Sequence, residues 1–120
     1  MVAAAFLTRE LEQEGLLVKS VSKAAPLFGE AARGGWSVAF VDVELPDGRG
    51  AAFLRELRET FEHPARADAE VPTVIALVRD ADDIAEARRA GISLVLRKPF
   101  DADALHVLLR RTGIVAEDGR

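Results

Sequence analysis

The chain has 120 residues, 49% of them hydrophobic, which is enough for one core, and we expect a single domain over residues 1–120. Its 20 acidic residues outnumber its 16 lysines and arginines, and a net charge of −4 without a basic cluster argues against nucleic-acid binding. The absence of cysteine excludes disulfides and thiolate metal sites, and no apolar run approaches the roughly 20 residues of a membrane span, so we expect a cytoplasmic protein without a membrane anchor.

Two periodicities alternate along the chain, and glycines, prolines and acidic residues separate them. Apolar residues at helical spacing predict five helices. Short apolar runs predict five strands, several of them nearly continuous in apolar residues, as in parallel strands covered on both faces. In chain order the predicted elements are helix 2–14, strand 16–22, helix 24–33, strand 36–43, helix 51–61, strand 71–78, helix 80–91, strand 92–100, a helix that Asp101 caps, and strand 113–118.

This alternation of helices and strands predicts the fold class. Short connections between them are typical of parallel sheets with right-handed crossovers, and the count indicates a flavodoxin-like, doubly wound α/β fold. Such sheets place their chemistry at the carboxyl ends of the strands. Acids stand there in two predicted strands, Asp42 in one and the pair Glu117 and Asp118 in the last. The acidic run 80–83 stands at a helix start instead, which favours a role at the helix dipole over a metal loop.

Two segments carry a resemblance to a known family. The segment VAFVDVELPDGRG resembles the phosphoacceptor region of response-regulator receiver domains of two-component signalling, with an apolar strand, Asp42 at its tip, then Leu-Pro and a glycine. The later LVLRKPF resembles the Lys-Pro-Phe at the end of their fifth strand, and Gly91 precedes Lys98 at the family's spacing. The resemblance spans residues 6–109 and implies a five-stranded parallel sheet in the order 2-1-3-4-5, with a cis bond before Pro99.

The resemblance also implies a phosphoacceptor site. Asp42 would accept a phosphoryl group from the phosphohistidine of a histidine kinase or phosphotransfer protein. Lys98 would bind a phosphoryl oxygen as a point charge. Crowded carboxylates need a cation among them, and Mg²⁺ with oxygen ligands suits such a site. The implied ligands are Asp118, Asp42, the backbone carbonyl of Glu44 and, partly through water, Glu117.

The position of the acidic pair is unusual for this family. Receivers start with a strand that ends in two acids, whereas this chain starts with the first helix. The closing segment GIVAED, residues 113–118, resembles that first strand, and joining Arg120 to Val2 would separate Asp118 from Gly15 as in receivers. The chain therefore resembles a circular permutant whose first strand lies at the carboxyl terminus. The same strand could complement a second chain, or it could begin a second, incomplete receiver.

The switch positions depart from the family pattern. Receivers carry Ser or Thr after the fourth strand, where this sequence offers Val78 or Ala76, and Val95 stands at the coupled aromatic position. An alternative function is therefore a pseudo-receiver that binds protein partners without phosphate. The resemblance implies that a dimer or domain partner would use the face formed by helix 80–91, strand 92–100 and the helix after it.

Simpler and less favoured interpretations also apply to the same residues. Asp42 and Lys98 could form a plain ion pair at strand ends. For Asp47 and Gly48, in contrast, the favoured interpretation is that they are turn residues only. A small molecule such as a cyclic dinucleotide could bind basic residues near the strand tips, namely Arg88, Arg89 or Arg97. A conventional enzyme is not predicted, because the sequence has no nucleophile-base-orienter set and no glycine-rich phosphate loop; slow autophosphatase activity is the most we expect.

Overall fold

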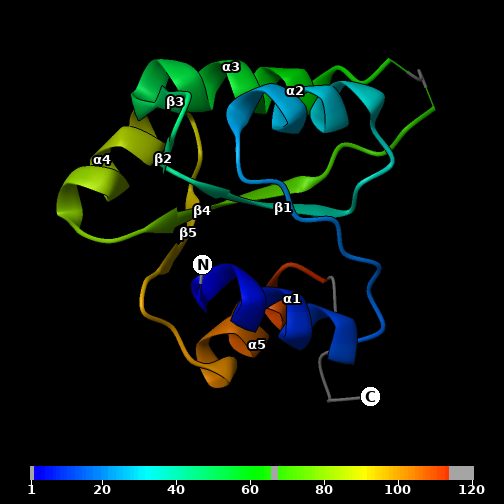
Figure 1. The fold of residues 1–120 in the computed structure, drawn as a ribbon, viewed down its shortest axis with the longest axis vertical. Coiled ribbons are helices and arrows are strands. Elements are labelled where there is room, and N and C mark those ends of the chain that lie inside the picture. Colours follow the sequence, from blue (N-terminus) through cyan, green and yellow to red (C-terminus); the bar gives the residue numbers. More distant parts are fainter. Residues whose placement is uncertain (1, 66–67, 114–120) are drawn as a thin grey trace.

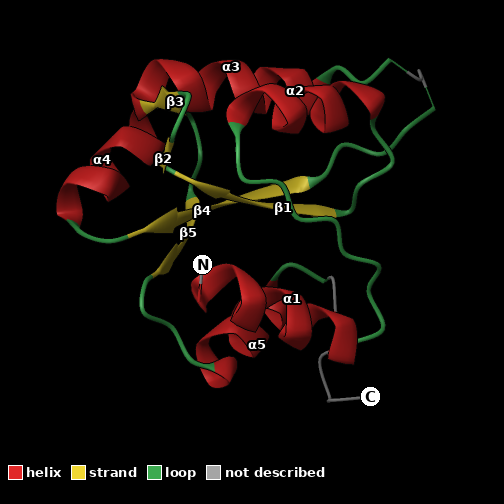
Figure 2. Cartoon of the chain, in the orientation of Figure 1, coloured by secondary structure: helices red, strands yellow, loops and turns green. Residues whose placement is uncertain are grey.

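The computed structural model describes residues 2–65 and 68–113. Within them, helices cover both faces of a central parallel sheet (Figures 1 and 2). No helix of this described part is both long and apolar enough to cross a membrane. The helices are α1 (Val2–Gln13), α2 (Ala24–Arg33), α3 (Gly50–Glu62), α4 (Ala81–Arg89) and α5 (Ala102–Arg111). The strands are β1 (Val38–Asp42), β2 (Glu44–Leu45), β3 (Gly48–Arg49), β4 (Thr73–Val78) and β5 (Leu94–Arg97).

The central sheet has three parallel strands in the order β1-β4-β5. The register places Asp42 opposite Leu77, and Val78 opposite Arg97, so the carboxyl ends of all three strands meet at one edge. Helices α3 and α4 provide the crossovers between them. The predicted parallel sheet is thus confirmed for the strands predicted at 36–43, 71–78 and 92–100, in slightly shorter form.

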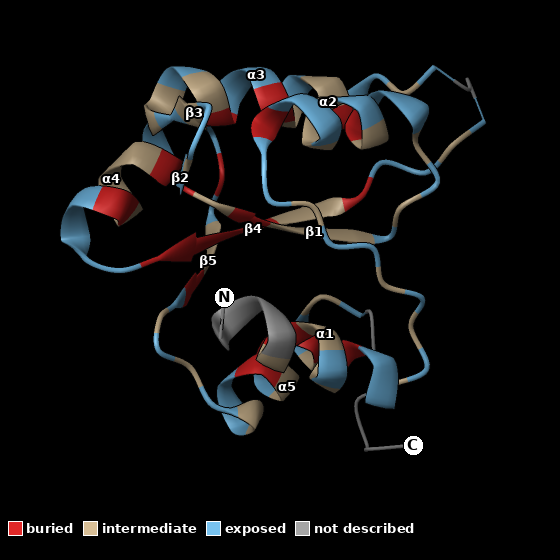
Figure 3. Ribbon diagram, viewed as in Figure 1, coloured by how far each residue is buried: buried red, intermediate tan, exposed pale blue. Residues whose placement is uncertain are grey.

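Each face of the sheet has its own apolar core, as expected for a sheet that is covered twice. Along β4, Ile75 and Leu77 pack toward α1 and α5, while Ala76 and Val78 pack toward α3 and α4. The helices turn buried positions toward the sheet, and these are coloured red in Figure 3. The most deeply buried large side chains among them include Leu54, Leu57 and Phe61 of α3 and Leu105 and Leu109 of α5. The helical stripes read from the sequence are therefore the packed faces.

Acidic side chains begin two of the helices, as predicted. The Asp101 carboxylate accepts a hydrogen bond from the Ala104 N–H at 2.9 Å, which caps α5. The Asp80 carboxylate accepts one from the Asp83 N–H at 3.0 Å, which caps α4. Among the described residues no three His, Cys, Asp or Glu side chains group together as a metal site would require. The acidic run 80–83 therefore serves the helix start.

The strand predicted at 16–22 is wrong. This segment has no regular secondary structure, and the Leu17 side chain is 97% exposed. A strand forms only beside a partner, and of the described residues only β4 pairs with β1. In the predicted order the neighbour of segment 16–22 is strand 113–118, of which residues 114–118 lie outside the described residues. The five-strand order and the circular permutation therefore remain predictions.

The segment after Asp42 contains more structure than the turn predicted there. Strands β2 and β3 form a short antiparallel hairpin, with Glu44 opposite Arg49. Asp47 at its tip accepts hydrogen bonds from the Ala24 N–H at 2.6 Å and the Ala25 N–H at 3.2 Å. Because the N-cap residue of α2 makes no side-chain cap of its own, Asp47 supplies the cap from 23 positions away in the sequence. Asp47 is therefore more than a turn residue.

We expect Asp47→Ala to lower the free energy of unfolding, because α2 then begins without a cap. The hydrogen bond from the Ala24 N–H holds the pKa of Asp47 below its ordinary value of 3.8. A carboxylate whose pKa is lower in the folded state stabilises the protein above the ordinary value, and this stabilisation is lost as the pH falls through the folded pKa. Urea unfolding should therefore separate the variant from the wild type more at pH 7 than at pH 3.

The control is Glu59→Ala, which removes an exposed carboxylate from α3 and no helix cap, and should lower the free energy of unfolding at pH 7 much less than Asp47→Ala. An equal loss of stability at both pH values for Asp47→Ala would show that the residue acts through packing and not through its charge.

Candidate functional site

The carboxyl edge of the sheet brings together two residues that the sequence singled out. Asp42 ends β1 and Lys98 follows β5 directly. Lys98 Nζ lies 2.5 Å from Asp42 Oδ1, and the two side chains are only 22% and 19% exposed. A charge-assisted hydrogen bond of this length in a partly buried place fixes both side chains. The structure thus places the predicted phosphoacceptor and the predicted phosphoryl-binding lysine in direct contact.

Lys98 is held in place by the neighbouring strand. Its backbone N–H donates to the Val78 carbonyl at 2.7 Å, which extends the β4–β5 ladder by one step beyond Arg97. The Lys98–Pro99 peptide bond is cis, as the resemblance implied. The ammonium group of Lys98 therefore projects from a backbone that is anchored to β4.

A second set of charges lies at the same edge, around Arg79, the residue that follows β4. Its guanidinium donates to the Asp83 carboxylate through Nε at 2.8 Å and through Nη2 at 3.1 Å, and Nη2 also lies 3.5 Å from a carboxylate oxygen of Glu44. Asp83 is only 5% exposed and also accepts from the Arg79 N–H at 2.9 Å. The hydrogen bond from the Arg79 side chain lowers the pKa of Asp83 although burial opposes this, so the buried acid is charged.

Arg79 was missed in the sequence. The sequence feature that could have identified Arg79 is its position as a basic residue directly after a buried strand, at the edge of the sheet where acidic residues of other strands lie. Because Glu44 lies in β2 and Asp83 in α4, Arg79 joins the hairpin after β1 to the helix after β4.

Two of the four predicted metal ligands lie within the described residues. They are Asp42, which would supply a carboxylate, and Glu44, two positions later, which would supply its backbone carbonyl. The other two, Glu117 and Asp118, lie outside the described residues. Oxygen ligands of this kind suit Mg²⁺, which is usually bound by one or two carboxylates and keeps several waters. The donors that the structure describes fit Mg²⁺ in chemical type and form one part of the predicted set.

Apolar side chains occupy the predicted switch positions. Val78 and Ala76 are fully buried in the core between the sheet and α3 and α4, and Val95 packs against the same cluster. Ala76 is also the direct register partner of Val95. At the end of β4, the polar group nearest along the chain is therefore Arg79.

The arginines of the small-molecule hypothesis do not share one edge of the sheet. Arg97 ends β5 at the carboxyl edge, whereas Arg88 and Arg89 end α4, just before the chain enters β5. Because α4 returns from the carboxyl edge of β4 to the amino edge of β5, its last turn lies away from Asp42. The three side chains therefore do not converge on the strand tips.

Comparison with known proteins gives one consistent picture. A family model described as the response regulator receiver domain matches residues 1–110. The "Uncharacterized transcriptional regulatory protein YkoG" of Bacillus subtilis (strain 168) is 32% identical over 117 residues, which are 93% of this chain and 48% of that protein. The chain thus spans about half the length of this relative.

Solved structures show the same similarity. The receiver domain of sensor histidine kinase PA1611 from Pseudomonas aeruginosa PAO1, with a magnesium ion coordinated in its active site cleft, is 26% identical at a TM-score of 0.73, over 93% of this chain and 89% of that one. The co-crystal structure of the Saccharomyces cerevisiae phosphotransfer protein Ypd1 and the receiver domain of Ssk1 gives a TM-score of 0.77 at 19% identity, over 94% and 82%. The second likeness shows the fold alone.

The Arg79 contacts predict a difference between two arginines of the same region. Arg79→Ala leaves the buried Asp83 carboxylate without its cation, so we expect a lower free energy of unfolding at pH 7. Arg89→Ala removes only an exposed pair with Glu86 and should cost much less. Since the pKa of Asp83 is lowered in the fold, the loss in Arg79→Ala should shrink as the pH falls below the ordinary aspartate range. Equal losses in the two variants in urea unfolding would contradict this assignment.

Proposed function

The chain belongs to the response regulator receiver domain family of two-component signalling, and we propose that it accepts a phosphoryl group on Asp42. The observation that carries the proposal is the 2.5 Å contact between Asp42 and Lys98 at the carboxyl edge of the sheet. An acid and a cation held together at strand tips, partly shielded from water, suit phosphoryl transfer, in which positioning and electrostatics supply most of the catalysis.

The transfer itself is a substitution at phosphorus. A carboxylate oxygen of Asp42 attacks the phosphorus of a phosphohistidine, the P–O bond forms, and the P–N bond to the imidazole breaks. The product is an acyl phosphate on Asp42. Lys98 Nζ, which donates to Asp42 Oδ1 at rest, then donates to an oxygen of the new phosphoryl group.

Mg²⁺ is the cofactor that we propose for this site. When bound, it neutralises charge on the phosphoryl oxygens. The residues that would hold it are Asp42, the carbonyl of Glu44, Asp118 and, through water, Glu117. The last two reach the site if the carboxyl-terminal segment takes the place of the family's first strand, as in a circularly permuted receiver with the strand order 2-1-3-4-5 over residues 1–120.

The donor of the phosphoryl group would be a histidine kinase or a phosphotransfer protein in the cytoplasm. This chain shares its fold with the Ssk1 receiver domain, which crystallised with the phosphotransfer protein Ypd1. That shared fold supports a donor of the same class. A dimer or domain partner would use the face of α4, β5 and α5. Val107 on α5 is half-exposed, so α5 offers one apolar side chain to a partner.

The second candidate function is a pseudo-receiver that binds its partner without phosphate. The buried Val78 favours it, because a valine there cannot hydrogen-bond to a phosphoryl group as a hydroxyl could.

Incubation with Mg²⁺ and acetyl phosphate tests the proposed function. Intact-mass measurement should show one added phosphoryl group on the wild type and none on Asp42→Asn. Lys98→Ala should slow its formation by roughly 10²-fold or more, the typical effect of removing one transition-state donor. Asp82→Asn changes a carboxylate in the first turn of α4, at the same edge, and should react like the wild type.

The opposite result has a clear meaning. A folded wild-type protein without an adduct, and without Mg²⁺-dependent shifts in its backbone NMR spectrum, would refute the phosphoacceptor function. The pseudo-receiver would then be the better account.

A further inference from the structure

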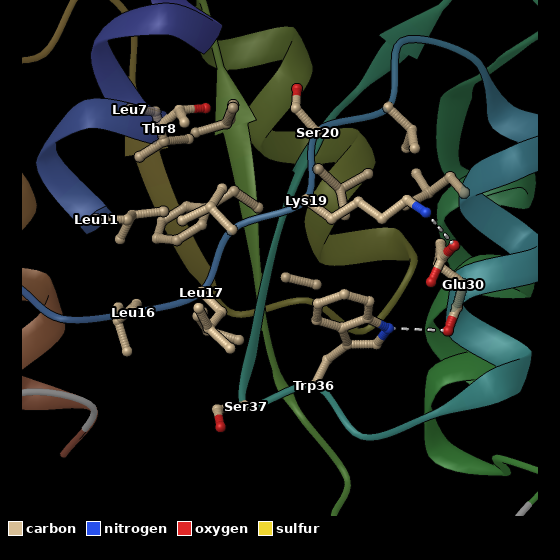
Figure 4. A pocket seen from close by; sticks show the side chains of 18 of the residues that line it. Leu7, Thr8, Leu11, Leu16, Leu17, Lys19, Ser20, Glu30, Trp36 and Ser37 are labelled. Atoms are coloured by element: carbon tan, nitrogen blue, oxygen red, sulfur yellow. Dashed lines mark hydrogen bonds and ion pairs between the residues drawn. The ribbon is translucent and has the colours of Figure 1, made fainter.

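One edge of β1 has no strand beside it in the part of the chain that the structure describes. β1 pairs with β4 from Val38 to Asp42, and β4 pairs with β5, so β1 is the outermost strand of the sheet. A cavity of about 380 Å³ lies beside it, and all five residues of β1 line this cavity. Segment 16–21 forms another wall (Figure 4). The cavity thus has the length of a five-residue strand.

Apolar side chains line this cavity on both sides of the sheet, and the Lys19–Glu30 ion pair lies beside them. Leu7 and Leu11 of α1 line it from one side, where they belong to the core shared with α5. Leu27 of α2 and Phe61 of α3 line it from the other, where they belong to the second core. In Figure 4, Leu7 and Leu11 lie on one side of the cavity and Trp36 on the other. Whatever fills it is covered on both faces.

The edge of β1 adds a second requirement. The backbone N–H and C=O groups of β1 that point away from β4 need hydrogen-bond partners, because buried backbone groups are almost always paired. An occupant that is apolar on both faces and offers a ladder of backbone donors and acceptors is a β-strand. One end of the cavity is lined by Asp42, so this strand also reaches the candidate site.

We propose that residues 114–118 of the same chain fill this cavity as a strand parallel to β1. The proposal rests on the proposed function in one respect, because the acids that end this strand are those assigned to the metal. Its sequence matches the cavity: Ile114, Val115 and Ala116 suit the two apolar walls, and the acids Glu117 and Asp118 follow them. Five residues here face the five residues of β1.

The path of the chain supports this occupant over others. Helix α5 follows β5 and returns antiparallel to it, so it ends at the edge of the sheet where β1 begins (Figure 1). Gly113 follows Thr112, the C-cap of α5, with a φ of +80°, a conformation that allows a sharp reversal. A chain that turns back at Gly113 runs parallel to β1 and brings its acids to the end where Asp42 lies.

The charges link this strand to the metal. A seated strand adds two carboxylates beside Asp42, whose cation in the described residues is Lys98. Like charges at this distance repel, and a divalent cation among them relieves the repulsion. Seating of the strand and binding of Mg²⁺ therefore stabilise each other by linkage.

A cysteine cross-link tests the proposal without phosphate. The chain has no cysteine, so an introduced pair is the only one. With Asp118 opposite Asp42, Val115 lies opposite Ala39, at a separation that a disulfide can bridge. We expect the double variant Ala39→Cys, Val115→Cys to form an intramolecular disulfide under mild oxidation with Mg²⁺. The control pair Ala52→Cys, Val115→Cys, with its first cysteine on the exposed side of α3, should not.

Hydrogen exchange provides a second measurement on the full chain. Val115→Asp places a charge between the apolar walls, and we expect the amides of β1 and of segment 16–21 to lose protection in Mg²⁺. Gly119→Asp adds the same charge beyond the strand and should leave protection unchanged. Equal protection in the wild type and in Val115→Asp would overturn the proposal.

Each of the other outcomes also tests either the strand proposal or the phosphoacceptor function. An Ala39→Cys, Val115→Cys protein that folds but forms no disulfide overturns the proposal, and a disulfide between two chains assigns the strand to a second copy and overturns the intramolecular form. An Asp42 adduct without the cross-link would refute the strand and leave the phosphoacceptor function standing. A cross-link without an adduct would refute the phosphoacceptor function alone.

Discussion

The parallel ladder of β1, β4 and β5 is the constraint on which the candidate site depends. Asp42 and Lys98 are 56 positions apart, and they meet because both strands run in the same direction and end at the same edge of the sheet. The hydrogen bond from the Lys98 N–H to the Val78 carbonyl fixes the position of Lys98 along β4. The register of Asp42 with Leu77 fixes the position of Asp42 along the same strand. A slip of one residue in either pairing would turn a side chain to the other face of the sheet.

The helices cover a wider sheet than the three described strands provide. α1 packs with α5 on one face and α2 packs with α3 on the other (Figure 2). Both α1 and α2 also contribute walls to the cavity beside β1. Two helical layers that face each other across a position without a strand leave apolar surface to be filled, because protein interiors are packed as densely as organic crystals. Among the described residues, segment 16–22 likewise has no strand beside it with which to pair, which explains why it is not a strand there.

The structural features that could be predicted from the sequence are those determined by residues close together in the chain. The helical stripes, the Asp101 cap and the strand ending at Asp42 follow from periodicity and from residues close in the chain, and the structure has them. That Asp42 and Lys98 share one site was implied by the resemblance to receiver domains, and their ion pair was the less favoured interpretation of the sequence. Asp47 was underestimated and Arg79 was missed because their partners, the start of α2 in one case and Glu44 with Asp83 in the other, are set by tertiary packing. The strand predicted at 16–22 was wrong for a related reason, because strand formation depends on a neighbouring strand more than on the intrinsic propensity of the residues.

The charges at the carboxyl edge explain why a phosphoacceptor here requires a cation. In the described residues Asp42 is balanced by Lys98, and Arg79 is shared between Glu44 and Asp83. A phosphoryl group brings about 1.5 to 2 further negative charges at neutral pH. Lys98 can bind the phosphoryl group only if its ammonium group moves away from the Asp42 carboxylate oxygen that it contacts. Arg79 is already hydrogen-bonded to the buried Asp83, whose pKa this hydrogen bond lowers. For the proposed phosphoacceptor, the described residues would therefore supply less positive charge than the product needs, and a divalent cation bound by Asp42 and its neighbours would meet that deficit.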